Sequence, residues 1–574
     1  MTLATPLPPE IIARTKSGTR AATQVLRALA AHGVRAAFGI PGGAAGPIFD
    51  ALSDVPEIEL VSTRHETTAV FAAIGHARAT GVPALVIVTA GPGVTNTLTG
   101  VASAHLEEVP LIVLGGEVAT TWAGRGAFQD GSQGGLDVVT LMRNVTRWSA
   151  SVYAPSMAAG AAARAWSIAT GSRPGPVFLS IPYDVGQASS LGGTIVSSPD
   201  PVPIPPAAAC KAAAEFLGAA RRPLLVLGSG ARHAVREGVE LAERLSSPVV
   251  ATPHAKGVFP ERHPLYLGLI GNVGHPSACD YIASGPDVVC VVGSRLGDFA
   301  TNAWRTPIAG RSATIQIDRD PFLIGRNAPV TLGIVGDASA TLLAIATHLP
   351  EEERCSGSSI RERVALRTKP WNENAPAGLV KPQRAVIGLG EAFPDAIFCS
   401  DIGEHMGFAQ HYLCVDGPDR FHCMSGLGSM GSGFGAAIGI KHANPGTTVV
   451  VFVGDGGFNM HVGEMLTCVE HRIGVVFVVF NDGRWSMVEH GFRAVFRRAP
   501  GGLPKQVANL AAVARAYGAD GHVIDSAAAL APERLRSLVR GPTPLVLDVR
   551  IDPSESLSDS TRSSALALIG KGST

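Results

Sequence analysis

The chain has 574 residues, 46% of them apolar and only 16% charged, a composition that fills large cores and excludes disorder over most of the length. Its 47 Lys and Arg residues balance 47 Asp and Glu residues, which argues against a nucleic-acid partner or an anionic membrane surface. The longest apolar strings, residues 84–88 and 475–480, are too short to span a membrane, and residues 1–16 contain no apolar signal core. The eight cysteines form no Cys-x-x-Cys pair, which indicates a reducing compartment. We therefore expect a soluble cytoplasmic protein.

Short apolar strings bounded by Gly or Pro alternate with Ala-rich helical stretches along the chain. Such strings suit strands that are buried on both faces, as in parallel sheets. They occur at residues 83–93, 110–116, 176–182, 222–230, 286–294, 448–457 and 474–483. Helical patterns such as residues 18–33 supply the crossovers between them. The pattern predicts an α/β protein of doubly wound parallel sheets, whose ligands bind beyond the carboxyl ends of the strands.

Two breaks divide the chain into three predicted domains. Residues 197–210 are rich in proline and are expected to form neither a helix nor a central strand. Residues 349–378 are polar and contain no apolar strand. The last residues are rich in serine and are expected to form a mobile tail. The predicted boundaries are 15–190, 205–350 and 375–555 for the three α/β domains and 556–574 for the tail.

Polar residues follow two consecutive predicted strands in the third domain. Gly-Asp-Gly, centred on Asp455, ends one strand, and Asn-Asp-Gly, beginning at Asn481, ends the next. In a right-handed βαβ unit both turns lie at the same sheet edge, so Asp455 and Asn481 can offer oxygen ligands to one Mg²⁺. Gly456 and Gly457 would let backbone amides approach phosphate oxygens at a helix start. The alternative is two ordinary strand-end turns, because Gly, Asp and Asn are common turn residues.

These two turns resemble the thiamine-diphosphate fingerprint, in which Gly-Asp-Gly is followed at this spacing by Asn. Further segments are similar to the acetohydroxyacid (acetolactate) synthase family, namely residues 38–52, 64–104, 173–185, 294–299, 317–327, 403–410 and 425–439. The resemblance implies a pyrimidine-binding, a middle and a diphosphate-binding domain, with thiamine diphosphate and Mg²⁺ as cofactors. It also implies a homodimer or homotetramer, because different chains of this family hold the two ends of the cofactor.

Glu66, in an Arg-His-Glu sequence, matches the family's catalytic glutamate. A carboxyl group that touches the cofactor's pyrimidine ring can share a proton with it, and an apolar pocket raises the pKa of such a group. The alternative is an ordinary glutamate at a helix N-terminus, where the helix dipole stabilises it. Met430 matches the bulky residue that bends the cofactor, although a lone methionine is more often part of a core.

The resemblance assigns four sets of residues, for each of which a turn glycine or a satisfied surface side chain is the ordinary alternative. The catalytic set is Glu66, Gln129 and Gly42. The cofactor-binding set is Pro41, Pro92, Asn96, Gly403, Glu404, His405, Gly428, Met430, Asp455, Gly456, Gly457 and Asn481. The metal ligands are Asp455, Asn481 and Gly483, and the substrate pocket contains Phe128, Met487, Gly491 and Arg295.

Four positions depart from the family's pattern. The family's lysine near the site is here Arg147, and its tyrosine before Pro-Gly-Gly is Ile40. Glu404 replaces a glutamine beside the diphosphate, where a carboxylate would be repelled unless it turned away or found a cation. Gly491 stands where biosynthetic members carry a tryptophan, which implies a larger or differently shaped acceptor pocket and weakens an assignment to branched-chain amino-acid synthesis. The alternative is that Gly491 serves a turn with positive φ and that a neighbouring aromatic side chain fills the gap.

The resemblance implies a thiamine-diphosphate-dependent carboligase. A 2-oxo acid, with pyruvate the first candidate, loses CO₂ and passes its acyl carbanion equivalent to a second carbonyl compound, giving an acyloin or a 2-hydroxy-2-acyl acid. One alternative is a simple 2-oxo acid decarboxylase, against which the absence of any His-His pair in the sequence argues. Another is a non-catalytic nucleotide-binding regulatory subunit, against which Glu66, Asp455 and Asn481 argue. The acceptor, and binding of FAD by the middle domain, are left open.

Overall fold

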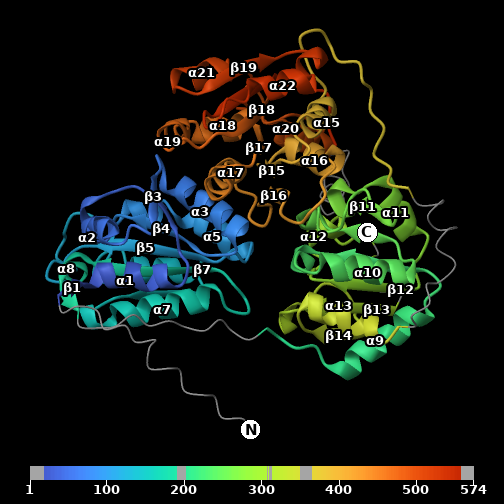
Figure 1. Cartoon of the computed structure of the whole chain (residues 1–574). Helices are drawn as coiled ribbons and strands as arrows, with labels where there is room; N and C mark the ends of the chain where they lie inside the picture. Colours follow the sequence, from blue (N-terminus) through green and yellow to red (C-terminus); the bar gives the residue numbers. More distant parts are fainter. Residues whose placement is uncertain (1–17, 191–201, 307, 309–312, 350–364, 558–574) are drawn as a thin grey trace.

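The computed structural model describes residues 18–190, 202–306, 308, 313–349 and 365–557. Three six-stranded sheets, each entirely parallel, form three α/β domains (Figure 1), which confirms the predicted fold class. The exact domain boundaries stay a prediction. Of the predicted tail, only residues 556 and 557 belong to the described part. No helix within that part is both long and apolar enough to cross a membrane.

The first domain, blue to teal in Figure 1, has the strand order β3-β2-β4-β5-β7-β6. Its strands are β2 (Ala36–Gly39), β3 (Glu59–Ser62), β4 (Ala84–Val88), β5 (Leu111–Glu117), β6 (Trp148–Ser151) and β7 (Pro176–Pro182). Its helices are α1 (Ala21–Ala31), α2 (Gly46–Ala51), α3 (Glu66–Thr80), α4 (Pro92–Thr95), α5 (Leu98–Leu106), α6 (Val138–Arg143), α7 (Ala158–Ala169) and α8 (Tyr183–Gln187), with 3-10 turns η2 (Gly43–Ala45), η3 (Leu52–Asp54) and η4 (Pro155–Met157). Two short strands, β1 (Thr19–Arg20) and β8 (Ser189–Ser190), pair antiparallel beside the sheet.

The middle domain, green to yellow in Figure 1, has the strand order β11-β10-β9-β12-β13-β14. Its strands are β9 (Pro223–Leu227), β10 (Val249–Ala251), β11 (Tyr266–Leu269), β12 (Val288–Val292), β13 (Ala313–Asp318) and β14 (Leu332–Val335). Its helices are α9 (Ala207–Ala219), α10 (Val235–Leu245), α11 (Pro276–Ala283), α12 (Asp298–Thr301) and α13 (Ala338–Thr347), with η5 (Ser229–Ala231), η6 (Pro253–Ala255), η7 (Gly271–Val273) and η8 (Pro321–Leu323). The prediction that residues 197–210 contain no helix is wrong at its end, because α9 begins directly after Pro206, a residue type that suits a helix start.

The third domain, orange to red in Figure 1, has the strand order β16-β15-β17-β18-β20-β19. Its strands are β15 (Ile397–Ser400), β16 (Phe421–Cys423), β17 (Val449–Gly454), β18 (Val475–Asn481), β19 (Asp520–Ile524) and β20 (Leu545–Arg550). Its helices are α15 (Pro382–Ala392), α16 (Glu404–Tyr412), α17 (Ser432–Ala443), α18 (Asp455–His461), α19 (Glu464–Glu470), α20 (Ser486–Phe496), α21 (Leu510–Ala516) and α22 (Pro532–Leu538), with η9 (Ala527–Leu530). The first and third sheets therefore repeat one topology, strand for strand.

The first and third domains share one hydrophobic core, which Phe38 and Phe71 enter from one side and Phe434 and Phe477 from the other. Its centre is the contact between α3 and α17, which lie side by side in Figure 1. Glycines make this contact close. A Cβ atom on Gly439 would lie only 1.8 Å from the Ala72 carbonyl oxygen.

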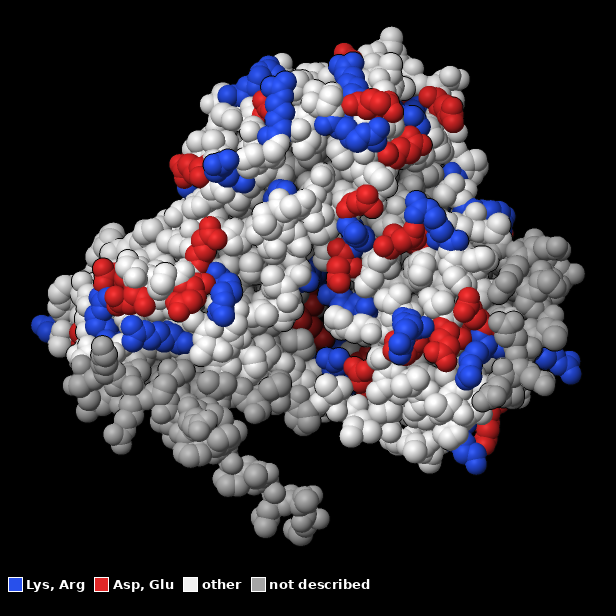
Figure 2. All heavy atoms as spheres, in the orientation of Figure 1, with Lys and Arg blue, Asp and Glu red and all other residues white. Residues whose placement is uncertain are grey.

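On the face drawn in Figure 2, basic and acidic side chains are interspersed, in keeping with the balanced charge of the sequence. This face is hollowed between the first and middle domains. The described residues 365–378 have no regular secondary structure and lead from the middle domain to the third.

The close approach of α3 and α17 predicts that Gly439→Ala destabilises the protein. The added methyl group meets backbone rather than a flexible side chain, and such overpacking commonly costs about 1–3 kcal/mol. Gly446→Ala is the matched control, because no atom lies within 4 Å of its Cβ position. The measurement is the thermal unfolding midpoint of both variants. Equal midpoints would show that the two helices can separate without penalty.

Candidate active site

The turns after β17 and β18 meet at one edge of the third sheet. Gly454 pairs with Phe480 in the parallel register, so Asp455 and Asn481 follow at the same level. The Asp455 carboxylate accepts hydrogen bonds from the backbone N–H groups of Gly456, Gly483 and Arg484. Burial first, and then the charge of Asp482, raise the pKa of Asp455 to about 7. A divalent cation at this position would relieve the repulsion between the two carboxylates.

The Asn481 side chain holds its oxygen in place, and that oxygen has no hydrogen-bond partner among the described residues. Its Nδ2 donates to the Ala508 carbonyl oxygen at 2.9 Å and to Asp548 Oδ1 at 2.8 Å. The opposite atom, Oδ1, is buried and accepts no hydrogen bond from the described residues. A buried acceptor of this kind costs stability unless a ligand satisfies it. The carboxylate and the amide oxygen are hard ligands that fit Mg²⁺.

Glycines shape the space beside these oxygens. A Cβ atom on Gly456 would lie 2.7 Å from Trp485 Nε1 and 3.0 Å from the terminal methyl group of Met430. A Cβ atom on Gly457 would lie 2.2 Å from Asp401 Oδ2. Side chains of the protein therefore pack directly against the backbone at 456–457, where only glycine fits, and the Met430 side chain lies beside it. This arrangement fits the anchoring end of a diphosphate.

Asp401 was missed by the sequence analysis. It follows β15, is fully buried, and accepts hydrogen bonds from the N–H groups of Gly431 at 2.8 Å and Gly433 at 3.1 Å. Burial raises its pKa to about 6. It fixes the loop that carries Gly428 and Met430. The signal that could have revealed it is its position at a strand end, the same signal that identified Asp455.

His405 lies behind the Gly454 turn. Its ring carbon Cε1 is 3.3 Å from the position of a Cβ atom on Gly454. Burial lowers its pKa to about 4, so the ring is neutral near pH 7. Its Nε2 is buried without a partner among the described residues. The ring therefore has an unused hydrogen-bonding nitrogen at the predicted cofactor edge.

Glu66 is the first residue of α3, at the carboxyl edge of the first sheet. Asn96 Nδ2 donates to Glu66 Oε2 at 3.0 Å, which joins two of the predicted site residues. The turn before Glu66 is held by Glu464 of α19, which is 1% exposed. Its carboxylate accepts the N–H groups of Arg64 at 3.0 Å and His65 at 2.9 Å. Glu464 was also missed, because its partners lie about 400 residues away in the chain.

The remaining first-domain residues line the same edge and are open to solvent in the single chain. Gly42 packs on Thr89, and a Cβ atom there would lie 2.6 Å from Thr89 Cβ. Gln129 has a positive φ of 62° and its Cβ lies against Gly91. Phe128 is 88% exposed. Pro41, Pro92 and Asn96 are exposed as well.

Gly491 lies in the middle of α20, and no atom lies within 4 Å of its Cβ position. The alternative that it serves a turn with positive φ is wrong, because its backbone is helical. Met487, one turn earlier on the helix, is 38% exposed. The space beside Gly491 is therefore open in the single chain, and the predicted acceptor pocket stays a prediction.

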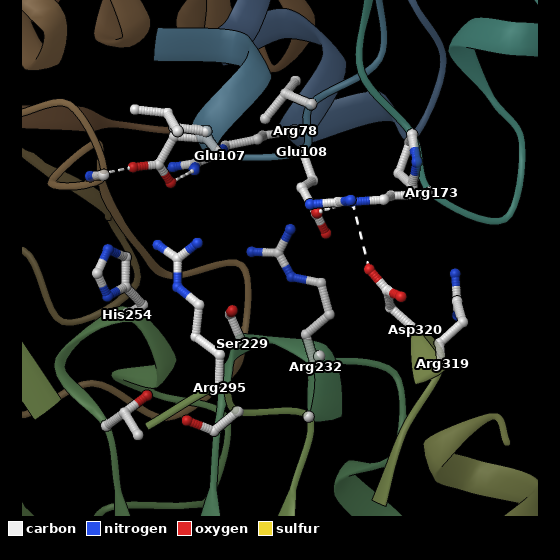
Figure 3. A pocket seen from close by; sticks show the side chains of 18 of the residues that line it. Arg78, Glu107, Glu108, Arg173, Ser229, Arg232, His254, Arg295, Arg319 and Asp320 are labelled. Carbon is white, nitrogen blue, oxygen red and sulfur yellow. Dashed lines mark hydrogen bonds and ion pairs between the residues drawn. The ribbon is translucent and has the colours of Figure 1, made fainter. Parts of the chain in front are cut away.

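A separate cavity of about 780 Å³ lies where the three domains meet (Figure 3). Arg232 and Arg295 extend into it from the middle domain, towards Glu107 and Glu108 of the first domain. Burial lowers the pKa of Arg232, whose Nε has no partner among the described residues. This cavity therefore has unused cationic hydrogen-bond donors, and it contains the predicted pocket residue Arg295.

Arg147 does not lie near the candidate site, although the resemblance placed the family's lysine there. It precedes β6 at the amino edge of the first sheet, where its N–H donates to the Pro176 carbonyl oxygen. Its guanidinium contacts Glu108 and the Pro174 carbonyl oxygen. Glu66 lies at the opposite, carboxyl edge. The arginine that replaces the family's lysine therefore lies beside the three-domain cavity and away from Glu66.

The fold and the site define a three-domain α/β protein with buried carboxylate and amide oxygens at strand ends. Three family models match it in order: the thiamine pyrophosphate enzyme N-terminal TPP binding domain at residues 19–136, the central domain at 210–345 and the C-terminal TPP binding domain at 401–549. Thiamine pyrophosphate is another name for thiamine diphosphate. The chain belongs to the thiamine pyrophosphate enzyme family, as its motifs predicted.

Individual relatives are similar over nearly the whole chain. A probable acetolactate synthase large subunit of Methanocaldococcus jannaschii is 33% identical over 560 residues, covering 94% of this chain and 93% of the relative. The acetolactate synthase isozyme 3 large subunit of Escherichia coli is 33% identical over 558 residues, covering 93% and 95%. A crystal structure of benzoylformate decarboxylase from Polynucleobacter necessarius superposes with a TM-score of 0.81 at 24% identity, covering 93% of this chain and 99% of the other. That likeness shows the shared fold.

Proposed function

We propose that this protein is a thiamine-diphosphate- and Mg²⁺-dependent carboligase of the acetolactate synthase type. It decarboxylates a 2-oxo acid, with pyruvate as the donor, and joins the acyl unit to a second carbonyl compound. The observation that carries the proposal is the fixed, unpartnered Asn481 Oδ1 beside Asp455 at one sheet edge. The chain's similarity to acetolactate synthase large subunits supports the reaction class.

In this proposal the carboxyl edges of the third and first sheets have separate tasks. Asp455, Asn481 and the Gly483 carbonyl group would hold Mg²⁺, and the backbone at Gly456 and Gly457 would hold the diphosphate. Thiamine diphosphate, when bound, supplies the carbon nucleophile that a polypeptide lacks. Glu66 Oε2 accepts a hydrogen bond from Asn96, which orients the carboxyl group for proton exchange with the pyrimidine ring. Met430 would contact the cofactor and support its bent shape.

We expect a dimer in which the carboxyl edge of the first sheet in one chain faces the carboxyl edge of the third sheet in the other chain. Within one chain Glu66 is only partly covered, and Phe128 is 88% exposed. The third domain likewise exposes Met460 by 55%, Leu427 by 43% and Trp485 by 40% around its own edge. Exposed apolar side chains around a polar site favour association with another surface. A homodimer would cover both edges, and pairing of dimers would give a tetramer.

The cavity between the three domains is proposed as a nucleotide site, with FAD as the occupant to be tested. The unpartnered Arg232 Nε and the Arg295 side chain offer cationic donors for a phosphate group. A visible absorption spectrum of the purified protein distinguishes a flavin from a colourless nucleotide.

A simple 2-oxo acid decarboxylase is the second candidate, and it is weaker. Decarboxylases of this type often use paired histidines as proton donors, and the sequence contains no adjacent pair. Among the described residues, ring contacts join His76 with His442 and His275 with His411. Both lie in the packing between domains rather than beside Asp455 or Glu66. A product assay with pyruvate distinguishes the two candidates, because a carboligase gives a coupled product and a decarboxylase gives free aldehyde.

Glu66→Gln is expected to leave cofactor binding nearly intact and to remove most turnover. The amide keeps the shape and the contact with Asn96 but cannot share the proton, a loss that commonly costs about 10²–10⁴-fold in rate. Steady-state kinetics and calorimetric titration with thiamine diphosphate measure the two effects. The exposed Glu57→Gln is the matched control. Turnover of Glu66→Gln equal to that of the control would remove Glu66 from the mechanism.

Asp455→Ala is expected to abolish Mg²⁺-dependent retention of thiamine diphosphate. It removes one of two side-chain ligands, so the loss should exceed the about 10–100-fold typical of supporting residues. Calorimetric titration with thiamine diphosphate, with and without Mg²⁺, measures it. The exposed Asp525→Ala serves as the control. An affinity unchanged from the control would place the metal elsewhere.

Gly491→Trp is expected to depress reaction with long or branched acceptors while largely sparing pyruvate self-condensation. The new side chain enters the open space beside α20 and can fill about 150–250 Å² of surface. The measurement is kcat/KM for a short and a long acceptor, with Gly501→Trp as a control at another open glycine. An equal fall for both acceptors would remove the pocket argument.

A further inference from the structure

The peptide unit that follows Met430 is held at both of its polar groups. Its N–H group, which belongs to Gly431, donates to Asp401 Oδ2 at 2.8 Å. Its carbonyl group, which belongs to Met430, accepts a hydrogen bond from the His461 ring. A Cβ atom on Gly431 would lie 1.9 Å from His461 Nε2, so the ring lies directly against this peptide. Two side chains therefore fix the backbone from which the Met430 side chain projects.

The partners of His461 assign the hydrogens on its ring. A carbonyl oxygen can only accept, so the nitrogen that faces the Met430 carbonyl group, Nε2, carries a hydrogen. The other nitrogen, Nδ1, lies 2.8 Å from Thr68 Oγ1. Burial lowers the pKa of His461 to about 4, so the ring is neutral at neutral pH and Nδ1 accepts from the Thr68 hydroxyl group.

The Thr68 hydroxyl group also contacts the Glu464 carboxylate. If it gave its hydrogen to that carboxylate, both nitrogens of His461 would have to donate and the buried ring would be charged, which burial disfavours. Glu464 already accepts from the hydroxyl group of Thr467 at 2.7 Å. The hydrogen of Thr68 is therefore available to His461.

The packing around the imidazole and its place on a helix make its position rigid. The ring centroids of Phe71, on α3, and Phe434, on α17, each lie 6.1 Å from that of His461. His461 is the last residue of α18, the seven-residue helix that begins with Asp455. One short helix therefore connects the proposed metal ligand with the ring that holds the Met430 peptide, and both phenylalanines belong to the core shared by the first and third domains.

The loop before Met430 has anchors of its own. The N–H group of Gly426 donates to Glu107 Oε1 at 2.6 Å, and Ser429 Oγ lies 3.3 Å from Ser103 Oγ. These bonds place the loop, whereas the imidazole sets the orientation of the peptide next to Met430. Loss of the imidazole bond should therefore turn the methionine without releasing the loop.

We propose that His461 is a positioning residue that orients Met430 for contact with the cofactor. The inference rests on the proposed function, because it requires that Met430 touches thiamine diphosphate. The Met430 side chain lies beside the backbone proposed to bind the diphosphate, since its terminal methyl group is 3.0 Å from the position of a Cβ atom on Gly456. His461 acts through the peptide at 430–431 and not as an acid or a base, because the Met430 carbonyl group occupies its N–H hydrogen.

The test uses two substitutions that each retain one nitrogen position of the ring. His461→Gln places its amide nitrogen near the position of Nε2 and keeps a donor for the Met430 carbonyl group. His461→Asn reaches only as far as Nδ1, so it keeps an acceptor for Thr68 and loses the bond to Met430. Both full-length variants are titrated calorimetrically with thiamine diphosphate in the presence of Mg²⁺. Their unfolding midpoints without cofactor, and their kcat and KM for pyruvate, are measured beside them.

His461→Asn is expected to bind thiamine diphosphate about 10–100-fold more weakly than wild type, the range that loss of an outer hydrogen-bond partner commonly costs at a binding site. Its kcat should fall more than its KM for pyruvate rises. His461→Gln should remain close to wild type in both respects. The control is His442→Asn, which removes another histidine between the first and third domains, 5.6 Å from Phe38 by ring centroids. It should lower the unfolding midpoint without changing the affinity.

Every result bears on the inference. Equal losses of affinity in His461→Gln and His461→Asn, a larger loss in the glutamine variant, or affinities of both equal to that of the control overturn it and leave the proposed function intact. A wild-type protein that binds no thiamine diphosphate overturns the proposed function as well. If His461→Asn does not fold, His461→Leu takes its place in the comparison, because an apolar side chain keeps the packing between the two phenylalanine rings and removes both hydrogen bonds.

Discussion

The side-chain amide of Asn481 is the group on which the arrangement of the diphosphate edge depends. Its amide group donates hydrogen bonds to Ala508 and Asp548, and these two bonds fix the direction in which the oxygen points. Asp548 is fully buried in β20 and is itself fixed by the N–H group of Leu510, at the start of α21, and by Arg550. The unpartnered oxygen is therefore held by the neighbouring strand and helix rather than by its own turn. A buried acceptor so placed costs stability until a ligand satisfies it, as the Mg²⁺ of the proposed function would do.

Glu464 of the third domain fixes a turn of the first domain in a similar way. The N–H groups of Arg64 and His65 precede α3 and would be left without acceptors at a helix start. The carboxylate of Glu464 supplies them from the third domain, in hydrogen bonds that are partly buried. The shared core and the close α3–α17 contact hold the two domains at the distance that this bond requires. The position of Glu66 is thus set by packing between domains as much as by its own turn.

The fold was readable from the sequence because its strands are buried on both faces. The string at residues 474–483 contains β18, and that at 448–457 contains β17, since parallel strands covered by helices need continuous apolar runs. The meeting of Asp455 with the Asn481 turn followed from the handedness of the crossover.

What the sequence could not reveal depends on contacts between distant segments. Glu464 acquires its importance from partners in another domain, and no local pattern marks it, whereas the strand-end position of Asp401 does not reveal that its partners lie in the loop at 431–433. The spatial pair of His275 and His411, with ring centroids 4.3 Å apart, is invisible in a sequence without adjacent histidines. Gly491 was ambiguous between a turn and a pocket because a glycine is compatible with both, and it is the helical backbone of α20 that excludes the turn.

The cofactor edge and the acceptor side differ in how firmly they are built. Asp401, Asp455 and Asn481 are all less than 9% exposed and are held by strands. Along α20, by contrast, only Glu489 is buried, while Val488, Phe492 and Phe496 are exposed. Hydrogen bonds from Ser486 to Asp482 and from His490 to Glu404 attach this helix to the site. Under the proposed function, such a site would keep its chemistry on rigid strands and its choice of acceptor on a weakly anchored helix. Substitutions on α20 would then alter which carbonyl compound is accepted without disturbing the edge proposed to hold the metal and the diphosphate.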